Sequence, residues 1–245
     1  MREVRIYHSE RLVKDQEFFL SLEASHHIAK VLRMKEGQPL TLFNGTSQEF
    51  SSTIIQIDKK QVKVLIEDCW SKECESPIKI HLGQVISRGD KMEFTIQKAV
   101  ELGVSEISPL YSERCGVKLD KQREEKKIQQ WEKIIISACE QCGRTILPKL
   151  NPIRSLAQFC QNESAALRLT LHPRAEEGIN NLILPSENPT IDLLIGSEGG
   201  LTDEEIGLTV KHNFKEIILG PRVLRTETAA LTAISALQLK LGDLG

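Results

Sequence analysis

The stretch "IGSEGGLTDEE", residues 195–205, follows a mostly apolar run over residues 191–195 and precedes a predicted helix. Its three glycines can adopt left-handed backbone conformations and let another group approach the backbone closely. Thr202 and Glu205 have the spacing of a capping box, which predicts that a helix begins there. In open α/β sheets, ligands bind at loops that follow the carboxyl ends of strands. The stretch therefore indicates an α/β fold with a candidate ligand loop at residues 196–200.

The pattern around this loop is an alternation of apolar strands and amphipathic helices. Such an order predicts a mostly parallel sheet that is covered by helices on both faces. The expected strands are residues 78–86, 106–110, 167–171, 191–195 and 216–219. The expected helices are residues 91–102, 121–142, 202–212 and 226–241.

The N-terminal part of the chain reads instead as short strands. We expect these at residues 4–7, 40–43, 51–57 and 61–67, with turn signals at residues 44–45 and 58–59. Ile28, Val31 and Leu32 form a short apolar stripe, which predicts one helix that Gly37 ends. A small barrel with one helix fits this pattern. "CWSKECESP", residues 69–77, has no periodicity, so we expect two domains, residues 1–70 and 77–245.

Composition limits the class of protein. Of the 245 residues, 40% are hydrophobic and 27% are charged, which is typical of a soluble globular chain. The net charge of -2 excludes a uniformly basic nucleic-acid binder but leaves room for a local basic face. Charges occupy the N-terminal region where a signal peptide has an apolar core, and no apolar run approaches the roughly 18 residues of a membrane span. We expect a cytoplasmic protein that does not bind membranes.

The six cysteines favour reduced thiols over a disulfide framework. Cys139 and Cys142 have CxxC spacing, but no second matched pair completes a zinc site. Both also fall on or beside a helical apolar stripe, which favours packing over metal or redox chemistry. No metal is expected.

A second loop, "LGPRVLRTETAA" at residues 219–230, places polar side chains between an apolar strand and an apolar helix. Thr226 is a candidate cap for that helix, which Gly242 would end. If the two strands are neighbours, both loops line one pocket. Glu198 and Glu227 would make this pocket acidic and a poor cradle for phosphate. Since neither GxGxxG nor GxxxxGK[ST] occurs, a dinucleotide-dependent oxidoreductase is disfavoured.

Several motifs together resemble one family. They are "HHIAKVLRMKEGQPLTLFNG", "HLGQVISRGDKMEFTIQKAVELGV", "SERCGVKL", "ACEQCGR", "LHPRA", "IGSEGGLTDEE" and "LGPRVLRTETAALTAISALQ". In this order they are similar to the bacterial methyltransferases that modify a uridine of small-subunit (16S) ribosomal RNA at N3, members of the SPOUT superfamily. The resemblance implies S-adenosylmethionine as methyl donor, a C-terminal α/β domain with a deep trefoil knot, an N-terminal PUA-like β-barrel and a homodimer.

The resemblance also implies site residues. The cofactor-binding set is His172, Gly196, Glu198, Gly199, Gly200, Leu219, Gly220, Leu224, Arg225, Glu227 and Thr228. Because the proton on uracil N3 must leave, Arg225 is the candidate for stabilising the uracil anion and Glu227 the weaker candidate for a base. The alternative is that these two form an ion pair between loop and helix. Ser197 stands where the family usually has proline, which predicts a more flexible loop.

Binding to small-subunit ribosomal RNA, free or in an assembled 30S subunit, needs basic groups. Residues 112–154 hold ten Lys or Arg and six Asp or Glu, and residues 1–35 hold seven and five. Both excesses are modest. The expected RNA contacts are Arg5, Arg11, Lys30, Arg33, Arg88, Lys91, Arg114 and Arg144.

Arg144 has two further interpretations. It lies four residues after Glu140, so the two could form a surface pair on the long helix. The resemblance favours Gln141 and Arg144 as active-site or dimer-face residues. Two other functions stay open for the chain as a whole, namely methylation of a ribose 2′-oxygen and a catalytically inactive RNA-binding protein of ribosome assembly.

Overall fold

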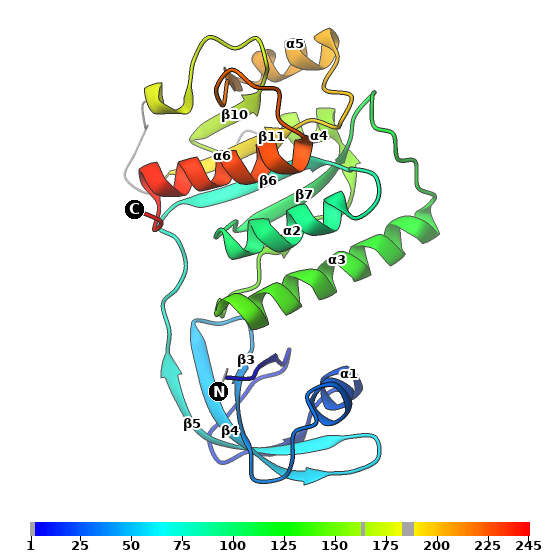
Figure 1. Ribbon diagram of the computed structural model, residues 1–245, viewed down its shortest axis with the longest axis vertical. Coiled ribbons are helices and arrows are strands. Elements are labelled where there is room, and N and C mark those ends of the chain that lie inside the picture. Colours follow the sequence, from blue (N-terminus) through cyan, green and yellow to red (C-terminus); the bar gives the residue numbers. More distant parts are fainter. Residues whose placement is uncertain (1–2, 163–164, 183–188) are drawn as a thin grey trace. The chain divides into compact units, whose positions relative to one another are not determined.

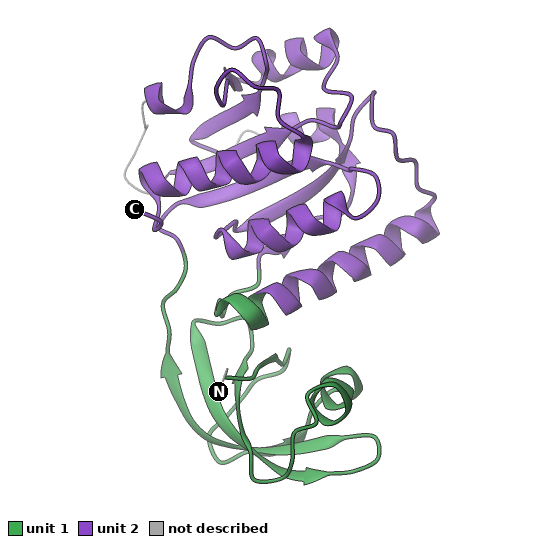
Figure 2. Ribbon diagram, in the orientation of Figure 1, with its two compact units in different colours: residues 1–75, 139–147 green, residues 76–138, 148–245 purple. Residues whose placement is uncertain are grey.

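The computed structural model describes residues 3–162, 165–182 and 189–245 (Figure 1). The chain divides into two compact units (Figure 2). Unit 1 comprises residues 1–75 and 139–147, and unit 2 comprises residues 76–138 and 148–245. Among the described residues, none of the helices combines the length and the apolar character that a membrane span requires.

Unit 1 is built on a five-stranded sheet in the order β1-β3-β4-β5-β2. The strands are β1 (Arg5–Tyr7), β2 (Glu17–Phe19), β3 (Pro39–Phe43), β4 (Gln48–Ile57) and β5 (Val62–Ser71). Strand β1 pairs with β3 in parallel and the other pairs are antiparallel. Four of these strands are confirmed predictions. The prediction missed β2, because three residues are too few to show a period.

The helix of unit 1 differs from the prediction. Helix α1 (Leu22–His26) continues as a π-helical segment, η1 (His27–Val31). Ile28 is buried, but Val31 and Leu32 are 60% and 40% exposed, so the predicted apolar stripe is wrong beyond Ile28. The π-helical turn changes the i, i+3, i+4 spacing that the prediction assumed. Gly37, with φ of +82°, does not end the helix; its N–H donates to Ile54 O at 2.8 Å.

Unit 2 contains a parallel sheet in the order β12-β10-β11-β6-β7-β8, with β9 also paired to β7. Its strands are β6 (Lys79–Val85), β7 (Glu106–Tyr111), β8 (Lys149–Leu150), β9 (Arg154–Ser155), β10 (Leu167–Leu171), β11 (Thr190–Ile195) and β12 (Lys215–Ile217). The helical segments are α2 (Lys91–Glu101), α3 (Lys121–Cys142), α4 (Leu156–Cys160), η2 (Ile179–Asn181), α5 (Asp203–Lys211) and α6 (Thr226–Leu241). The parallel sheet, its five longer strands and its four long helices are confirmed. The prediction missed β8, β9, α4 and η2, which are short.

Helices cover both faces of this sheet (Figure 1). Side chains alternate between the faces along a strand. On β6, His81 contacts Phe159 of α4, with ring centroids 5.0 Å apart, whereas Gln84 contacts Thr226 of α6. Gly83 shares the face of His81, and a Cβ there would lie 2.6 Å from Phe159, so only glycine fits. Because the strands are parallel, the loops after β6, β7, β10, β11 and β12 all leave the sheet at its carboxyl edge.

Candidate functional site

The glycine loop at residues 196–201 follows β11 at the carboxyl edge of the sheet of unit 2. Its end is fixed by the predicted capping box, which is confirmed: Thr202 Oγ1 accepts from Glu205 N–H at 3.2 Å, and Glu205 Oε2 accepts from Thr202 N–H at 3.0 Å. Within the loop, Gly200 has φ of +70° and its N–H donates to Ser197 O at 3.0 Å. The loop is a short turn whose outer residues, 198–200, are exposed.

The second loop, residues 218–225, connects β12 to α6. Strands β11 and β12 are not neighbours, because β10 lies between them. The two loops are nevertheless joined, since Thr226 Oγ1 donates to Gly196 O at 2.6 Å. Thr226 is also not the cap of α6; Arg225 holds the N-cap position without a side-chain hydrogen bond. The Thr226 hydroxyl links the loops instead.

Two side chains, Ser197 in the glycine loop and Arg114 beside it, hold the loop in place. Ser197 is buried, and its hydroxyl lies within hydrogen-bond distance of Arg114 O at 3.1 Å and Gly200 O at 3.3 Å. The Arg114 guanidinium donates to Gly199 O at 3.4 Å and Leu201 O at 3.2 Å. The sequence argument for a more flexible loop considered only the lost proline ring, and the Ser197 hydroxyl supplies an anchor that a proline lacks.

Glu198 of the glycine loop forms an ion pair with Lys91 at the start of α2. The Lys91 Nζ to Glu198 Oε1 distance is 2.9 Å, and each side chain is about a third exposed. Partial burial acts to raise the pKa of Glu198, but the hydrogen bond and charge of Lys91 outweigh it, so the pKa lies below the ordinary value. Lys91 and Arg114, predicted as RNA contacts, thus both contact the glycine loop.

The two candidate catalytic residues differ in their surroundings. Arg225 is exposed, whereas Glu227 is half-buried and its Oε2 is buried without a hydrogen-bond partner. Both residues lie in the described part of the chain, and no ion pair joins them. The interpretation of Arg225 and Glu227 as a structural ion pair is therefore wrong, and Glu227 keeps a buried carboxylate oxygen without a hydrogen-bond donor.

The other predicted cofactor residues lie on loops of the same edge, except Thr228, which lies in the first turn of α6. His172 follows β10, and its Nδ1 lies 3.0 Å from Glu216 Oε2 as an ion-pair contact without hydrogen-bond geometry. Gly220 has φ of +83°, a conformation that favours glycine. Leu219 and Leu224 are half-buried and Thr228 is exposed.

A cavity of about 190 Å³ lies elsewhere on unit 2, between the β6–α2 loop, α2, residues 117–119 and α3. Met92, Val117 and Trp131 are among the residues that line it. None of the predicted cofactor residues does. We take the joined loops, residues 196–201 and 218–225 with the start of α6, as the candidate site in preference to this cavity. They carry exposed glycine backbone and the carboxylates of Glu198 and Glu227.

The predicted RNA contacts of unit 1 fall into two groups. Arg5 and Arg144 are buried, 8% and 5% exposed. Arg5 contacts Glu49, and Arg144 Nε donates to Glu75 Oε1 at 3.0 Å. Neither presents a charge to a phosphate, so the expectation for these two is corrected to a structural role. Arg11, Lys30 and Arg33 are exposed, as is Arg88 of unit 2, whose Nε donates to Gly116 O at 3.2 Å.

The proposed surface pair between Glu140 and Arg144 does not form. Helix α3 ends at Cys142, so Arg144 lies beyond it. Glu140 Oε1 accepts from Tyr7 N–H at 3.0 Å, while Arg144 pairs with Glu75. Gln141 is exposed.

The cysteines of the CxxC pair differ in burial. Cys139 is fully buried, which confirms its packing role, whereas Cys142 is exposed. None of the six cysteines forms a disulfide. Within residues 3–162, 165–182 and 189–245, no group of three or more His, Cys, Asp or Glu is arranged to hold a metal ion.

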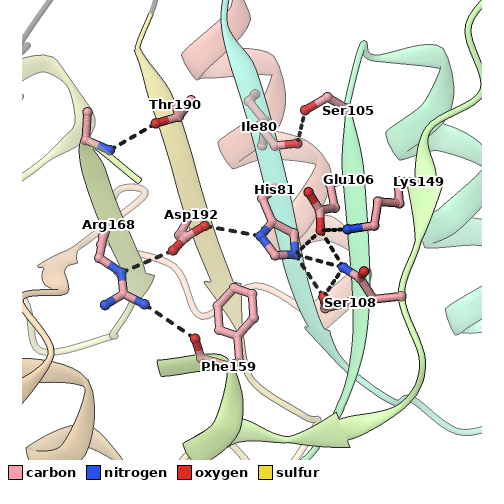
Figure 3. A network of polar contacts seen from close by, with 12 residues as sticks. Ile80, His81, Ser105, Glu106, Ser108, Lys149, Phe159, Arg168, Thr190 and Asp192 are labelled. Atoms are coloured by element: carbon pink, nitrogen blue, oxygen red, sulfur yellow. Dashed lines mark hydrogen bonds and ion pairs between the residues drawn. The ribbon is translucent and has the colours of Figure 1, made fainter. Parts of the chain in front are cut away.

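A buried polar network crosses the strands of unit 2 and has the order of a serine-hydrolase triad (Figure 3). Ser108 Oγ lies 2.8 Å from His81 Nε2, and His81 Nδ1 lies 3.2 Å from Asp192 Oδ1. However, Ser108 is fully buried and already accepts from Asn151 at 2.8 Å and Arg154 at 2.6 Å. Both lone pairs of the Ser108 hydroxyl are therefore occupied, which gives this buried serine a structural role.

Comparison with known proteins decides the family. Residues 74–238 match the family model of an RNA methyltransferase domain, and residues 21–67 match that of an RNA methyltransferase PUA domain. The protein called ribosomal RNA small subunit methyltransferase E in Buchnera aphidicola is 42% identical over 98% of this chain and 94% of its own length. Its counterpart in Bacillus subtilis is 33% identical over 90% of this chain and 89% of its own. The chain belongs to this family of ribosomal RNA methyltransferases.

Solved structures of the family have the same fold. A structure from Legionella pneumophila, described as a putative methyltransferase with bound SAM, is 49% identical with a TM-score of 0.97. A ribosomal RNA small subunit methyltransferase E from Neisseria gonorrhoeae, described as bound to S-adenosyl methionine, is 35% identical with a TM-score of 0.92. Both matches cover 100% of each chain. The N-terminal region is thus of the PUA type and the sheet of unit 2 is that of an α/β methyltransferase.

Sequence reasoning missed Gln84, which is fully buried near the end of β6 and donates to Thr226 Oγ1 at 3.0 Å. One signal could have found it. An uncharged polar residue in an otherwise apolar strand, directly before a carboxyl edge, needs a buried partner.

Proposed function

We propose that this protein transfers the methyl group of S-adenosylmethionine to N3 of a specific uridine in small-subunit ribosomal RNA. The observation that carries the proposal is the nearly end-to-end similarity to ribosomal RNA small subunit methyltransferases E, one of which is described with bound S-adenosyl methionine. The choice of uridine N3 rests on the resemblance of the motifs. The proposal includes the trefoil knot, the PUA-like barrel, the homodimer and the cytoplasmic location.

The residues at the joined loops fit the proposed cofactor. S-adenosylmethionine carries a cationic sulfonium and an amino group, and Glu227 Oε2 is a buried acceptor without a partner. The exposed glycine backbone at residues 199–200 and 220 allows close approach. Gly196, Glu198, Gly199, Gly200, Leu219, Gly220, Leu224, Arg225, Glu227, Thr228 and His172 would hold the cofactor. When bound, it supplies an activated methyl group.

The remaining chemical task is to remove the N3 proton of uracil. Arg225 has no ion-pair partner in the described structure and is exposed, so its fixed positive charge is available to stabilise the uracil anion. Glu227 is the second candidate and would accept the proton. Both lie at the start of α6, beside the loop that would hold the cofactor.

Binding of the RNA would use the exposed basic residues. Arg11, Lys30 and Arg33 on unit 1 and Arg88 on unit 2 present charge to solvent. Free ribosomal RNA and the assembled 30S subunit both present phosphates that these residues could bind. RNA binding should weaken as the salt concentration rises. A smaller salt dependence after substitution of each of these residues would support this assignment.

The experiment that tests the function is transfer of tritium from labelled S-adenosylmethionine to small ribosomal subunits from cells that lack the enzyme, followed by nucleoside analysis. The expected product is 3-methyluridine. Label in a 2′-O-methylated nucleoside would replace the base by the ribose as the target. Absence of label, with RNA binding intact, would favour an inactive RNA-binding protein of ribosome assembly. Sedimentation of the protein alone tests the homodimer.

A further inference from the structure

Two consecutive hydrogen bonds, made by two buried side chains, join the end of β6 to both loops of the candidate site. Gln84 Nε2 donates to Thr226 Oγ1 at 3.0 Å, and Thr226 Oγ1 donates to Gly196 O at 2.6 Å. Gln84 is fully buried and Thr226 is 6% exposed. We propose that Gln84 and Thr226 are positioning residues that hold the two loops in the geometry that binds the cofactor. The inference rests on the proposed function.

The direction of both hydrogen bonds, from Gln84 to Thr226 and from Thr226 to Gly196, can be assigned. The Gln84 amide nitrogen also donates to Val85 O at 3.0 Å, so both of its protons are used. A reversed amide would place Gln84 Oε1 against Val85 O, which is also an acceptor. The Thr226 hydroxyl therefore accepts from Gln84, and its single proton is directed to Gly196 O.

These two hydrogen bonds are important because no backbone pairing within the sheet connects the two loops. Strands β11 and β12 are separated by β10, so no ladder hydrogen bonds connect their ends. Gly196 is the first residue after β11 and Thr226 is the first residue of α6. The Gly196 carbonyl shares a peptide plane with Ser197 N–H, so fixing it sets the direction in which the glycine loop leaves the strand. The same hydroxyl fixes the turn of α6 that carries Glu227.

The structure offers matched variants. Thr226→Val removes the hydroxyl but keeps the branched shape, and Thr226→Ser restores the hydroxyl. Thr209 of α5 is a control of the same kind: it is fully buried and its Oγ1 donates to Ile206 O at 2.8 Å, away from both loops. Gln84→Met keeps the length of the side chain and removes both donors.

The test measures affinity for S-adenosylmethionine by calorimetry and hydrogen exchange of residues 196–201 in the protein without cofactor. We expect Thr226→Val and Gln84→Met to raise the Kd about tenfold and to speed exchange in the loop. Thr226→Ser should stay within about twofold of the original protein, as should Thr209→Val, although the latter loses a comparable buried hydrogen bond.

The outcomes separate the inference from the proposed function. An unchanged Kd in Thr226→Val, or an equal rise in Thr209→Val, would overturn the positioning role while leaving the function in place. If the original protein does not bind S-adenosylmethionine, the proposed function fails. In that case, unchanged exchange at residues 196–201 in Thr226→Val would overturn the link between the loops as well.

Discussion

Arg5 Nε lies 2.8 Å from Glu49 Oε1, and both side chains are buried, 6% and 4% exposed. The same guanidinium donates to Cys139 O at 2.5 Å and to Arg144 O at 3.0 Å. It thereby joins β1, β4 and the segment 139–147 of unit 1. Arg5, which was expected to contact RNA, is thus a buried structural residue at the centre of unit 1.

Replacing Arg5 by Ala should strongly destabilise the protein. Removing one partner of a buried ion pair costs about 3–5 kcal/mol, and we expect about 3 kcal/mol because Lys72 Nζ, 2.8 Å from Glu49 Oε1, still pairs with the carboxylate. Urea unfolding measures the change. Arg11→Ala, at an exposed arginine, should stay within about 0.5 kcal/mol and serves as control. Equal effects of the two variants would contradict the structural role of Arg5.

Glu140 gives a pH-dependent prediction. Burial raises its pKa, more than the hydrogen bond from Tyr7 N–H lowers it. The folded protein therefore binds this proton more tightly than the unfolded chain, and the free energy of unfolding falls as pH rises from the ordinary carboxyl pKa through the raised one. Glu140→Gln keeps an acceptor for Tyr7 and removes the charge, so it should flatten this fall and be more stable at neutral pH.

Urea unfolding at several values from about pH 4 to about pH 7 checks the Glu140 prediction. Glu132→Gln, at an exposed position of the same helix, is the control and should leave the pH profile unchanged. A Glu140→Gln profile that runs parallel to that of the original protein would show that Glu140 titrates alike in both states.

Thiol labelling should follow burial. Burial raises the pKa of Cys139 to about 12 and that of Cys160 to about 11, whereas Cys69 and Cys142 are exposed. Iodoacetamide at about pH 8 should modify Cys69 and Cys142 at least tenfold faster than Cys139 and Cys160, since only the thiolate reacts. Peptide mapping by mass spectrometry gives the rates, and urea-unfolded protein should label all six sites alike. Rapid labelling of Cys139 in the folded protein would contradict its burial.

Ser197→Ala tests the hydroxyl that anchors the glycine loop. Loss of its contacts with Arg114 O and Gly200 O should cost about 1 kcal/mol and raise the Kd for S-adenosylmethionine about fivefold. Calorimetry measures the affinity, and Ser137→Ala, at an exposed serine of α3, provides the comparison. Unchanged affinity would mean that the backbone alone holds the loop.

Arg225→Ala tests the proposed electrostatic role. Methyl transfer to small ribosomal subunits at saturating S-adenosylmethionine should fall about 100-fold or more, which exceeds any loss of cofactor affinity that the variant causes. Arg222 is an exposed arginine of the same loop, so Arg222→Ala controls for the loss of surface charge. Normal turnover in Arg225→Ala would remove this residue from the mechanism.

The long elements of unit 2 could be predicted because each is long enough to show its pattern of hydrophobic residues, as β6 and α3 are. The order of the strands within the sheet could not be predicted. The order of β10, β11 and β12 depends on pairs of residues 24 and 46 positions apart in the sequence, which a local pattern does not contain. The role of Thr226 was mistaken for the same reason, since a polar residue before a helix reads locally as a cap. Charge counting likewise could not separate exposed Arg11 from buried Arg5.

Unit 1 is assembled from two separate pieces of the chain, and one of them is the end of α3 with the loop that follows. The N-terminal region is therefore not a module that gene fusion could transfer intact by copying its first 75 residues, since Arg5 would lose the carbonyls of Cys139 and Arg144. A separately produced fragment of residues 1–75 would lack the part of unit 1 that residues 139–147 supply.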